Sequence, residues 1–333
     1  MRNKFVTLIP VLLAVLLMAG CSTDPEVAKR RYVENGNSYF DQGQYKQASI
    51  MYRNALKTDQ RFGEAWYRLG LTQLKMGDLT AAYGSLRRAA ELQPDNLDAK
   101  AQVADILMLA YRSDQRNRDQ YLREIDSLLN DASGLKTLHP ETFEAYRVDG
   151  SFDLLQASEL VEGVARKAGD AARQDSAEAQ KLFASAIEKL KKANSLKAND
   201  PGVVLTLART LAVLNQFDES EKLVKDLLAA RPDAALAYEF LFAQYTVRGR
   251  LADAEVVLHQ AIKANPQQEN FALQLAAFQR AQKKEAESVA TLKSYLDRAE
   301  DKAYAHLRIG DYWARMPDQQ KAQESYEAAL KAP

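Results

Sequence analysis

The chain has 333 residues, 47% hydrophobic and 27% charged, so it can bury a substantial core, and its composition excludes an intrinsically disordered protein. Its 45 basic and 45 acidic residues cancel, which gives no electrostatic reason to expect nucleic acid or an anionic membrane surface as a partner. Cys21 is the only cysteine, so neither a disulfide within the chain nor a cysteine-based metal site can form.

The first twenty residues have the pattern of a secretory signal. Arg2 and Lys4 form a short positive segment, Phe5–Leu17 is an apolar run, and Met18-Ala19-Gly20 supplies small residues before Cys21. The apolar run is shorter than the roughly 20 residues that a membrane-spanning helix needs. We therefore predict a cleaved signal peptide over 1–20.

The cysteine after this segment adds a more specific expectation. Met18-Ala19-Gly20-Cys21 resembles the lipobox of bacterial lipoproteins, although that family prefers Leu where Met18 stands. The resemblance implies that Cys21 is lipidated and becomes the first residue of the mature chain, with several acyl chains that form a stable anchor. Ser22 resembles the sorting pattern for the outer membrane, so we expect the periplasmic face of that membrane. Residues 21–28 are then a short lipidated linker.

Within 29–333, a 34-residue period is found on both sides of an irregular middle, across which the step from Ala82 to Ala186 is 104 residues, or three periods plus two. One column of small residues consists of Ala48, Ala82, Ala186, Ser220, Ala254, Ser288 and Ala322. A second small column consists of Gly36, Gly70, Ala104, Ala208, Ala276 and Gly310. Apolar residues follow the same period at Tyr52, Leu86, Leu190, Val224, Leu258, Leu292 and Tyr326. A fixed period with several matching columns indicates stacked helical repeats, in which small residues let neighbouring helices approach closely.

These columns resemble the tetratricopeptide repeat (TPR). The resemblance implies an all-α fold, a right-handed superhelical solenoid of stacked antiparallel helix pairs with about eight units. The clear copies cover 29–62, 63–96, 201–234 and 235–268, and weaker copies cover 269–302 and 303–333. Glycine suits the left-handed turn between the two helices of a unit, which predicts such turns at Gly43, Gly77 and Gly249.

The middle of the chain, 97–200, breaks the pattern. We expect helices over 97–111, 120–129, 141–157 and 177–196. The segment 158–176 is charged and rich in alanine and matches no column. We interpret it as an insertion that lengthens helices or projects from the stack, either as a docking feature or as a solvated extension.

Residues that could carry chemistry are sparse. The three histidines, His139, His259 and His306, lie far apart in the sequence, and no two have the spacing of metal ligands on one helix. Nucleophile-elbow, phosphate-loop and H-E-x-x-H motifs are missing from the sequence. We therefore predict a protein that is not an enzyme and has no cofactor, no metal site and no small-molecule substrate.

Candidate binding residues are the positions that TPR first helices turn toward their concave groove. On this register they are Arg30, Asn37, Tyr67, Leu71, Asp98, Asp105, Arg209, Glu239, Arg280, Tyr304 and Asp311. Their mixture of both charge signs and apolar groups suits a peptide or protein surface better than nucleic acid. Some TPR proteins clamp a C-terminal carboxylate with a Lys and Asn set, but that set is missing here, which argues against a chaperone-tail receptor.

The sequence thus predicts a membrane-anchored, non-enzymatic scaffold that binds other envelope proteins or peptides during assembly or export of cell-envelope components. The alternative is that the array is the accessory interaction module of a longer enzyme or signalling protein, of which this chain is the N-terminal part. The partner, the pathway and the oligomeric state are left open by the sequence, as is the choice between the concave and the convex face.

Overall fold

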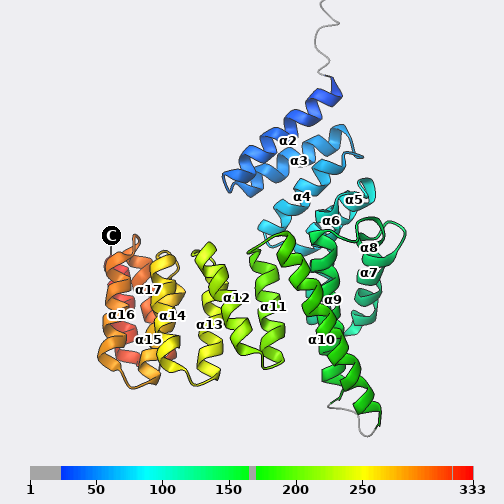
Figure 1. The fold of residues 1–333 in the computed structure, drawn as a ribbon. Coiled ribbons are helices and arrows are strands. Elements are labelled where there is room, and N and C mark those ends of the chain that lie inside the picture. The colour runs from blue at the N-terminus through cyan, green and yellow to red at the C-terminus, as the bar shows by residue number, and fades with distance from the viewer. Residues whose placement is uncertain (1–23, 165–169, 317, 333) are drawn as a thin grey trace, which may run out of the picture. The chain divides into compact units, whose positions relative to one another are not determined.

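The computed structural model describes residues 24–164, 170–316 and 318–332, and every regular element in these ranges is a helix (Figure 1). The predicted all-α fold of stacked antiparallel helix pairs is confirmed, and the helices are consistent with about eight such pairs. The signal peptide over 1–20 and the lipidation site Cys21 lie outside the described residues.

The chain forms two compact units, which divide between Leu182 and Phe183. The described helices of the first unit are α2 (Pro25–Asp41), α3 (Tyr45–Thr58), α4 (Gly63–Lys75), α5 (Leu79–Leu92), α6 (Leu97–Ser113), the 3₁₀ helix η1 (Gln115–Asn117), α7 (Arg118–Asn130), α8 (Leu135–Leu138) and α9 (Phe143–Val164). Helix α10 (Asp170–Leu196) begins in the first unit and ends in the second.

The rest of the second unit is a regular series of short helices. It contains α11 (Pro201–Val213), α12 (Phe217–Ala230), α13 (Ala235–Val247), α14 (Leu251–Ala264), α15 (Glu269–Ala281), α16 (Glu285–Arg298), α17 (Lys302–Arg315) and α18 (Gln319–Lys331). Each first helix has 13 or 14 residues, and each second helix also has 13 or 14.

Two expectations about helix limits need adjustment. Helix α2 begins at Pro25, inside the segment 21–28 that we expected to be a linker, because Pro fits the first helical turn and the Asp24 carboxylate accepts the Glu26 N–H at 2.9 Å. In the middle of the chain, the insertion over 158–176 extends α9 and α10 at its two ends. The structure also adds η1 and α8, which the sequence pattern did not predict.

The turn inside each unit uses a left-handed residue. Gly43, Gly77 and Gly249 have φ angles of 72°, 77° and 70°, which confirms the predicted turns. Asn215 and Lys283 occupy the same repeat position with φ angles of 59° and 64°. Asn215 tolerates this conformation, whereas the side chain of Lys283 disfavours it, so at Lys283 the helix pair imposes the turn geometry on the backbone.

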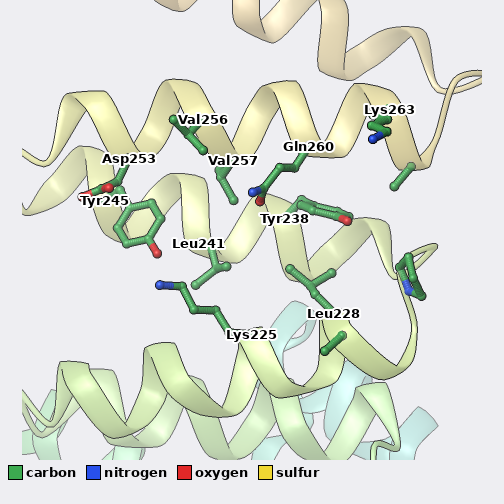
Figure 2. Close-up of a pocket in the computed structure, with 13 residues that line it drawn as sticks. Lys225, Leu228, Tyr238, Leu241, Tyr245, Asp253, Val256, Val257, Gln260 and Lys263 are labelled. Atoms are coloured by element: carbon green, nitrogen blue, oxygen red, sulfur yellow. The ribbon is translucent and has the colours of Figure 1, made fainter.

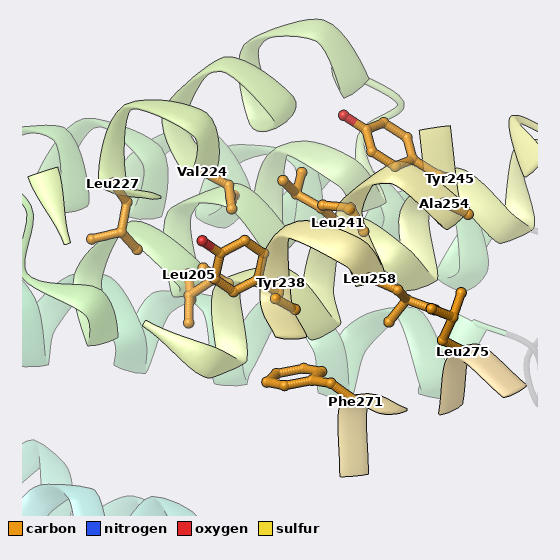
Figure 3. Close-up of a cluster of buried hydrophobic side chains, with 14 of the residues drawn as sticks. Leu205, Val224, Leu227, Tyr238, Leu241, Tyr245, Ala254, Leu258, Phe271 and Leu275 are labelled. Carbon is orange, nitrogen blue, oxygen red and sulfur yellow. The ribbon is translucent and has the colours of Figure 1, made fainter. Parts of the chain in front are cut away.

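The small columns let helices touch. A methyl group on Gly70 would lie 2.5 Å from Leu86 Cγ, and one on Gly310 would lie 2.4 Å from Tyr326 Cε1. The space beside these first-helix glycines is therefore occupied by apolar side chains of the second helices. In the second unit, this packing joins α11 to α15 through Leu205, Val224, Tyr238, Leu258 and Phe271 (Figure 3). Burying such side chains contributes roughly 1.5–3 kcal/mol each.

Candidate functional site

The first-helix surface carries the predicted groove residues, and four of them are exposed: Arg30, Arg209, Glu239 and Tyr304. The hydroxyl of Tyr304 lies 3.3 Å from Glu269 Oε1, so this side chain also spans to the preceding first helix. The exposed set contains two cations, one anion and one aromatic ring.

Other predicted groove residues hold neighbouring repeats together. The Tyr67 hydroxyl on α4 donates a hydrogen bond to the Asp98 carboxylate on α6, and burial together with this bond raises the pKa of Tyr67. Arg147 on α9 donates to Asp105 on α6 at 2.7 Å. Tyr67, Asp98 and Asp105, which were predicted to line the groove, thus form hydrogen bonds between neighbouring repeats.

Two more predicted residues accept hydrogen bonds from second-helix tyrosines. Asn37 Oδ1 accepts from the Tyr52 hydroxyl at 2.7 Å, and Asp311 Oδ1 accepts from the Tyr326 hydroxyl at 3.1 Å. Burial raises the pKa of Tyr52 to about 12, so its hydroxyl remains a donor at neutral pH.

The last two predicted groove residues are also partly buried. Leu71 packs against the apolar core of the first unit. The Arg280 guanidinium lies 5.1 Å from the centroid of the Trp313 ring and 3.5 Å from a Glu285 carboxylate oxygen.

A carboxylate on the second helix joins successive repeats in the second unit. Glu221 on α12 accepts hydrogen bonds from Arg250 at 2.6 Å, Lys225 at 2.7 Å and the Tyr245 hydroxyl at 2.9 Å. Burial alone raises the pKa of Glu221, but these donors outweigh it and bring the value down to about 2. One period later, Glu255 accepts from Lys284 at 2.6 Å and from Gln279 at 3.1 Å.

A buried serine forms a second periodic link. The Ser220 hydroxyl donates to the Ala208 carbonyl at 2.7 Å and accepts from Gln244 Nε2 at 3.0 Å. Two periods later, the Ser288 hydroxyl donates to the Ala276 carbonyl at 2.9 Å and lies 3.2 Å from the Tyr312 hydroxyl. Each serine therefore connects the two helices of its own unit to the first helix of the next.

The structure also contains clefts between consecutive second helices, each with a first helix as its floor. The cleft between α12 and α14, over α13, has a volume of about 620 Å³; we call it the C-terminal cleft (Figure 2). Lys225 and Leu228 line it from α12, opposite Val256 and Gln260 on α14. The cleft between α3 and α5, over α4, has a volume of about 890 Å³; we call it the N-terminal cleft.

The two clefts occupy the same repeat register, 172 residues apart. Thus Arg53 in the N-terminal cleft corresponds to Lys225, and Trp66 corresponds to Tyr238. Neither cleft was among the sequence-predicted sites, because the candidate positions were taken from first helices only. The N-terminal cleft could have been suspected from the sequence, because basic residues such as Arg53 and Lys57 stand at exposed second-helix positions.

The described ranges contain no group of three or more His, Cys, Asp or Glu side chains placed to hold a metal ion. His259 is exposed, and His139 Nε2 lies 3.3 Å from Asp95 Oδ1. None of the described helices combines the length and the apolar character that crossing a membrane requires.

Three segments of the chain match family models of this repeat. Residues 36–77 match a model described as "TPR repeat", and residues 63–96 and 177–241 match two models described as "Tetratricopeptide repeat". The chain therefore contains TPR units in both compact units, as its columns predicted. The matched segment 177–241 begins inside the irregular middle and includes most of α10.

Sequence relatives are distant and much longer. The chain is 23% identical over 256 residues to human tetratricopeptide repeat protein 7A, covering 76% of this chain and 27% of that protein. It is 27% identical over 131 residues to tetratricopeptide repeat protein 37 of Xenopus laevis, covering 39% of this chain and 8% of that protein. The chain thus spans about a quarter of the first relative and less than a tenth of the second.

Solved structures resemble the chain in fold. A human IFIT1 dimer with PPP-AAAA aligns with a TM-score of 0.50 at 15% identity, covering 97% of this chain and 77% of that chain. A tetratricopeptide repeat protein from Parabacteroides merdae aligns with a TM-score of 0.49 at 15% identity, covering 91% and 99%. Pseudomonas aeruginosa pilF aligns with a TM-score of 0.47 at 19% identity, covering 77% and 99%. At these identities the likeness concerns the fold alone.

Proposed function

We propose that the protein is a non-enzymatic scaffold that binds other proteins of the bacterial envelope, held at the membrane by a lipid on Cys21. Its mature array lies at the periplasmic face of the outer membrane and brings partners together during assembly or export of envelope components. The TPR units carry the general part of this proposal, because proteins with this repeat bind protein partners. The lipobox resemblance carries the anchor and the location.

The observation that supports a scaffold most directly is how the polar side chains are used. Glu221, Glu255, Ser220 and Ser288 are each committed to holding repeats together. The exposed first-helix residues Arg30, Arg209, Glu239 and Tyr304, by contrast, form a mixed surface that is open to solvent. Catalysis requires groups preorganised around a reacting atom, whereas protein binding requires an accessible surface of this kind.

Charge also favours protein partners over nucleic acid. Removing residues 1–20 takes away Arg2 and Lys4 and leaves 43 basic residues against 45 acidic ones. Proteins that bind nucleic acid without sequence preference neutralise phosphates with an excess of cations. The mature array has no such excess.

Photo-crosslinking in living cells tests the proposal. A photoreactive amino acid replaces Arg209 or Glu239, which are exposed on first helices, and the chain without a photoreactive residue is the control. We expect one or a few envelope proteins to be trapped from the exposed positions and none from the control. Purified partners should then bind the isolated array, and an array that traps no protein from any exposed first-helix position contradicts binding through this surface.

A further inference from the structure

The N-terminal cleft differs from its C-terminal counterpart in its charge. The charged side chains that line it are Arg53, Lys57 and Arg88, and no carboxylate lines it. Arg88 pairs with Glu91 at 3.0 Å. Arg53 and Lys57 are exposed and have no ion-pair partner among the described residues. Two cations at the rim of an 890 Å³ cleft are therefore available to an anionic ligand.

In the C-terminal cleft, carboxylates neutralise the positive charge that corresponds to Arg53. There Lys225 pairs with Glu221 at 2.7 Å, and Asp253 is itself part of the lining and pairs with Arg250 at 2.7 Å. At the same register, the N-terminal cleft has Ser49 in place of Glu221 and Ala81 in place of Asp253. The positive lining thus results from two carboxylates that are missing at defined repeat positions and from two added cations, because Lys57 and Arg88 stand where the C-terminal cleft has Ala229 and Gln260.

The shape of the N-terminal cleft suits a polypeptide segment. Leu56 and Leu69 form apolar parts of its lining, and the partly exposed Trp66 adds an aromatic surface, with its indole N–H already donated to the Gln60 carbonyl at 2.9 Å. On the α5 side, Gly84 leaves open space where Val256 narrows the C-terminal cleft. A side chain of a bound segment therefore has room beside an apolar wall.

The N-terminal cleft also contains a buried side-chain amide whose oxygen lacks a hydrogen-bond partner within the described part of the chain. Gln73 lines the same cleft and is 5% exposed, and its Oε1 has no hydrogen-bond partner among the described residues. A buried acceptor without a donor costs about 1–3 kcal/mol. A peptide offers acidic side chains for Arg53 and Lys57, and it offers an N–H to the Gln73 oxygen once that buried amide turns toward the cleft, whereas a phosphate group offers acceptors only.

We infer that the N-terminal cleft, on the second-helix side of residues 45–92, binds an acidic segment of a protein partner. This inference rests on the proposed scaffold function and adds a second binding surface to it. Arg53 and Lys57 hold the acidic side chains, and the wall formed by Leu56, Trp66 and Leu69 receives an apolar one. Binding of this kind weakens as salt screens the exposed charges.

Defined peptides test the inference on the purified mature chain. The probe is a fluorescein-labelled dodecapeptide of repeated Glu-Glu-Leu, and its counterparts have Gln-Gln-Leu and Lys-Lys-Leu. We expect the acidic peptide to bind at least five times more tightly than the Gln peptide by fluorescence anisotropy, with the difference reduced at high salt. Trp66 and Trp313 are the only tryptophans, so two indole N–H signals are expected in NMR, and only that of Trp66 should move.

Variants separate the cleft from the rest of the surface. Replacing Arg53 and Lys57 together by Gln should weaken binding of the acidic peptide about tenfold, and Gly84→Leu should weaken it by filling the cleft. Lys263→Gln, an exposed cation lining the C-terminal cleft, is the matched control and should leave binding unchanged. Circular dichroism spectra and unfolding midpoints verify that each variant is folded.

Three outcomes overturn the inference: equal binding of the Glu and Gln peptides, unchanged binding by the double variant, or a moving Trp313 signal with a fixed Trp66 signal. Vesicles of phosphatidylglycerol supply the lipid comparison; binding to them that needs Arg53 and Lys57, without binding of the peptide, identifies a lipid surface instead. Photo-crosslinking through Arg209 or Glu239 that persists in the double variant shows that failure of the cleft leaves the scaffold function intact.

Discussion

The Glu221 carboxylate on α12 accepts a 2.6 Å hydrogen bond from Arg250, 29 residues later at the start of α14. Glu255 and Lys284 repeat this relationship at the same distance of 2.6 Å one period further on. An ion pair that is reproduced one period later thus links helix pairs at two successive junctions of the second unit. Its energetic role can be measured because the pair is mostly withdrawn from water.

Glu221→Gln should reduce the free energy of unfolding by about 1–3 kcal/mol at pH 7, because Arg250 and Lys225 lose their anionic acceptor. The folded pKa of Glu221 is about 2, below its ordinary value of 4.5. The contribution is therefore present above pH 4.5 and is lost progressively as the pH falls toward 2. Urea unfolding at pH 7 and pH 2.5 should show a large wild-type minus variant difference at pH 7 and a small one at pH 2.5.

Glu219→Gln is the control on the same helix. Glu219 pairs with Lys191 at 2.7 Å, but both side chains are about half exposed, at 46% and 50%. Such pairs contribute about 0–1 kcal/mol. An effect of Glu219→Gln equal to that of Glu221→Gln contradicts a special role for the buried carboxylate.

Two glycines of one repeat should respond in opposite directions to alanine. Gly70→Ala places a methyl 2.5 Å from Leu86 Cγ and 3.2 Å from the Leu86 backbone nitrogen, and should destabilise the chain by about 1–3 kcal/mol. Gly84→Ala meets nothing within 4 Å on the exposed face of α5, and should stabilise by about 0.5–1 kcal/mol through helix propensity. Thermal unfolding of the two variants provides the measurement, and equal shifts would falsify the packing argument.

Lys283→Gly should stabilise the second unit. Lys283 has a φ of 64°, a left-handed conformation in which Gly249 stands at the equivalent turn. Relief of the side-chain clash offsets the greater flexibility of glycine in the unfolded chain, so we expect a gain of about 0.5–1 kcal/mol. The reverse change, Gly249→Ala, should cost a similar amount in the same chemical denaturation assay. A destabilising Lys283→Gly contradicts this account of the turn.

A double-mutant cycle on Ser288 and Tyr312 tests the polar link between α16 and α17. Both residues are buried and their hydroxyls lie 3.2 Å apart. Ser288→Ala leaves the Tyr312 hydroxyl without this partner, whereas the double variant with Tyr312→Phe leaves no unpaired hydroxyl behind. We expect a coupling free energy of about 0.5–1.5 kcal/mol from unfolding curves of the four proteins, and additive effects argue against the link.

Cys21→Ala should release the protein from membranes. The acyl chains that we propose on Cys21 contribute about 0.8 kcal/mol per buried CH₂, far more than weak electrostatic adsorption to a surface. Fractionation of cells should find the wild type in the membrane pellet after a high-salt wash and the variant in the soluble fraction. A variant that still sediments with membranes at high salt removes the basis for the lipid anchor.

The helical repeat was predictable from the sequence because its physical requirements recur in every unit. A first helix needs a small residue such as Gly70 where a second-helix residue such as Leu86 fills the space, and this requirement appears in the sequence as a column. Turn glycines such as Gly77 are visible for the same reason, since one backbone conformation is needed once per period. These features are local, so one helix pair is enough to impose them.

Contacts between units depended on the tertiary structure. The groove residues predicted from first helices divide into exposed ones, such as Arg209, and ones used internally, such as Asp105, and only stacking decides which is which. The two clefts also form only when helix pairs stack, and so do the surroundings of Arg53, in which two carboxylates are missing. A residue's hydrogen-bond partners in the next repeat lie 24 to 42 positions away in the contacts described above. Whether such side chains meet depends on the angle and separation at which helix pairs stack, which a one-dimensional period does not specify.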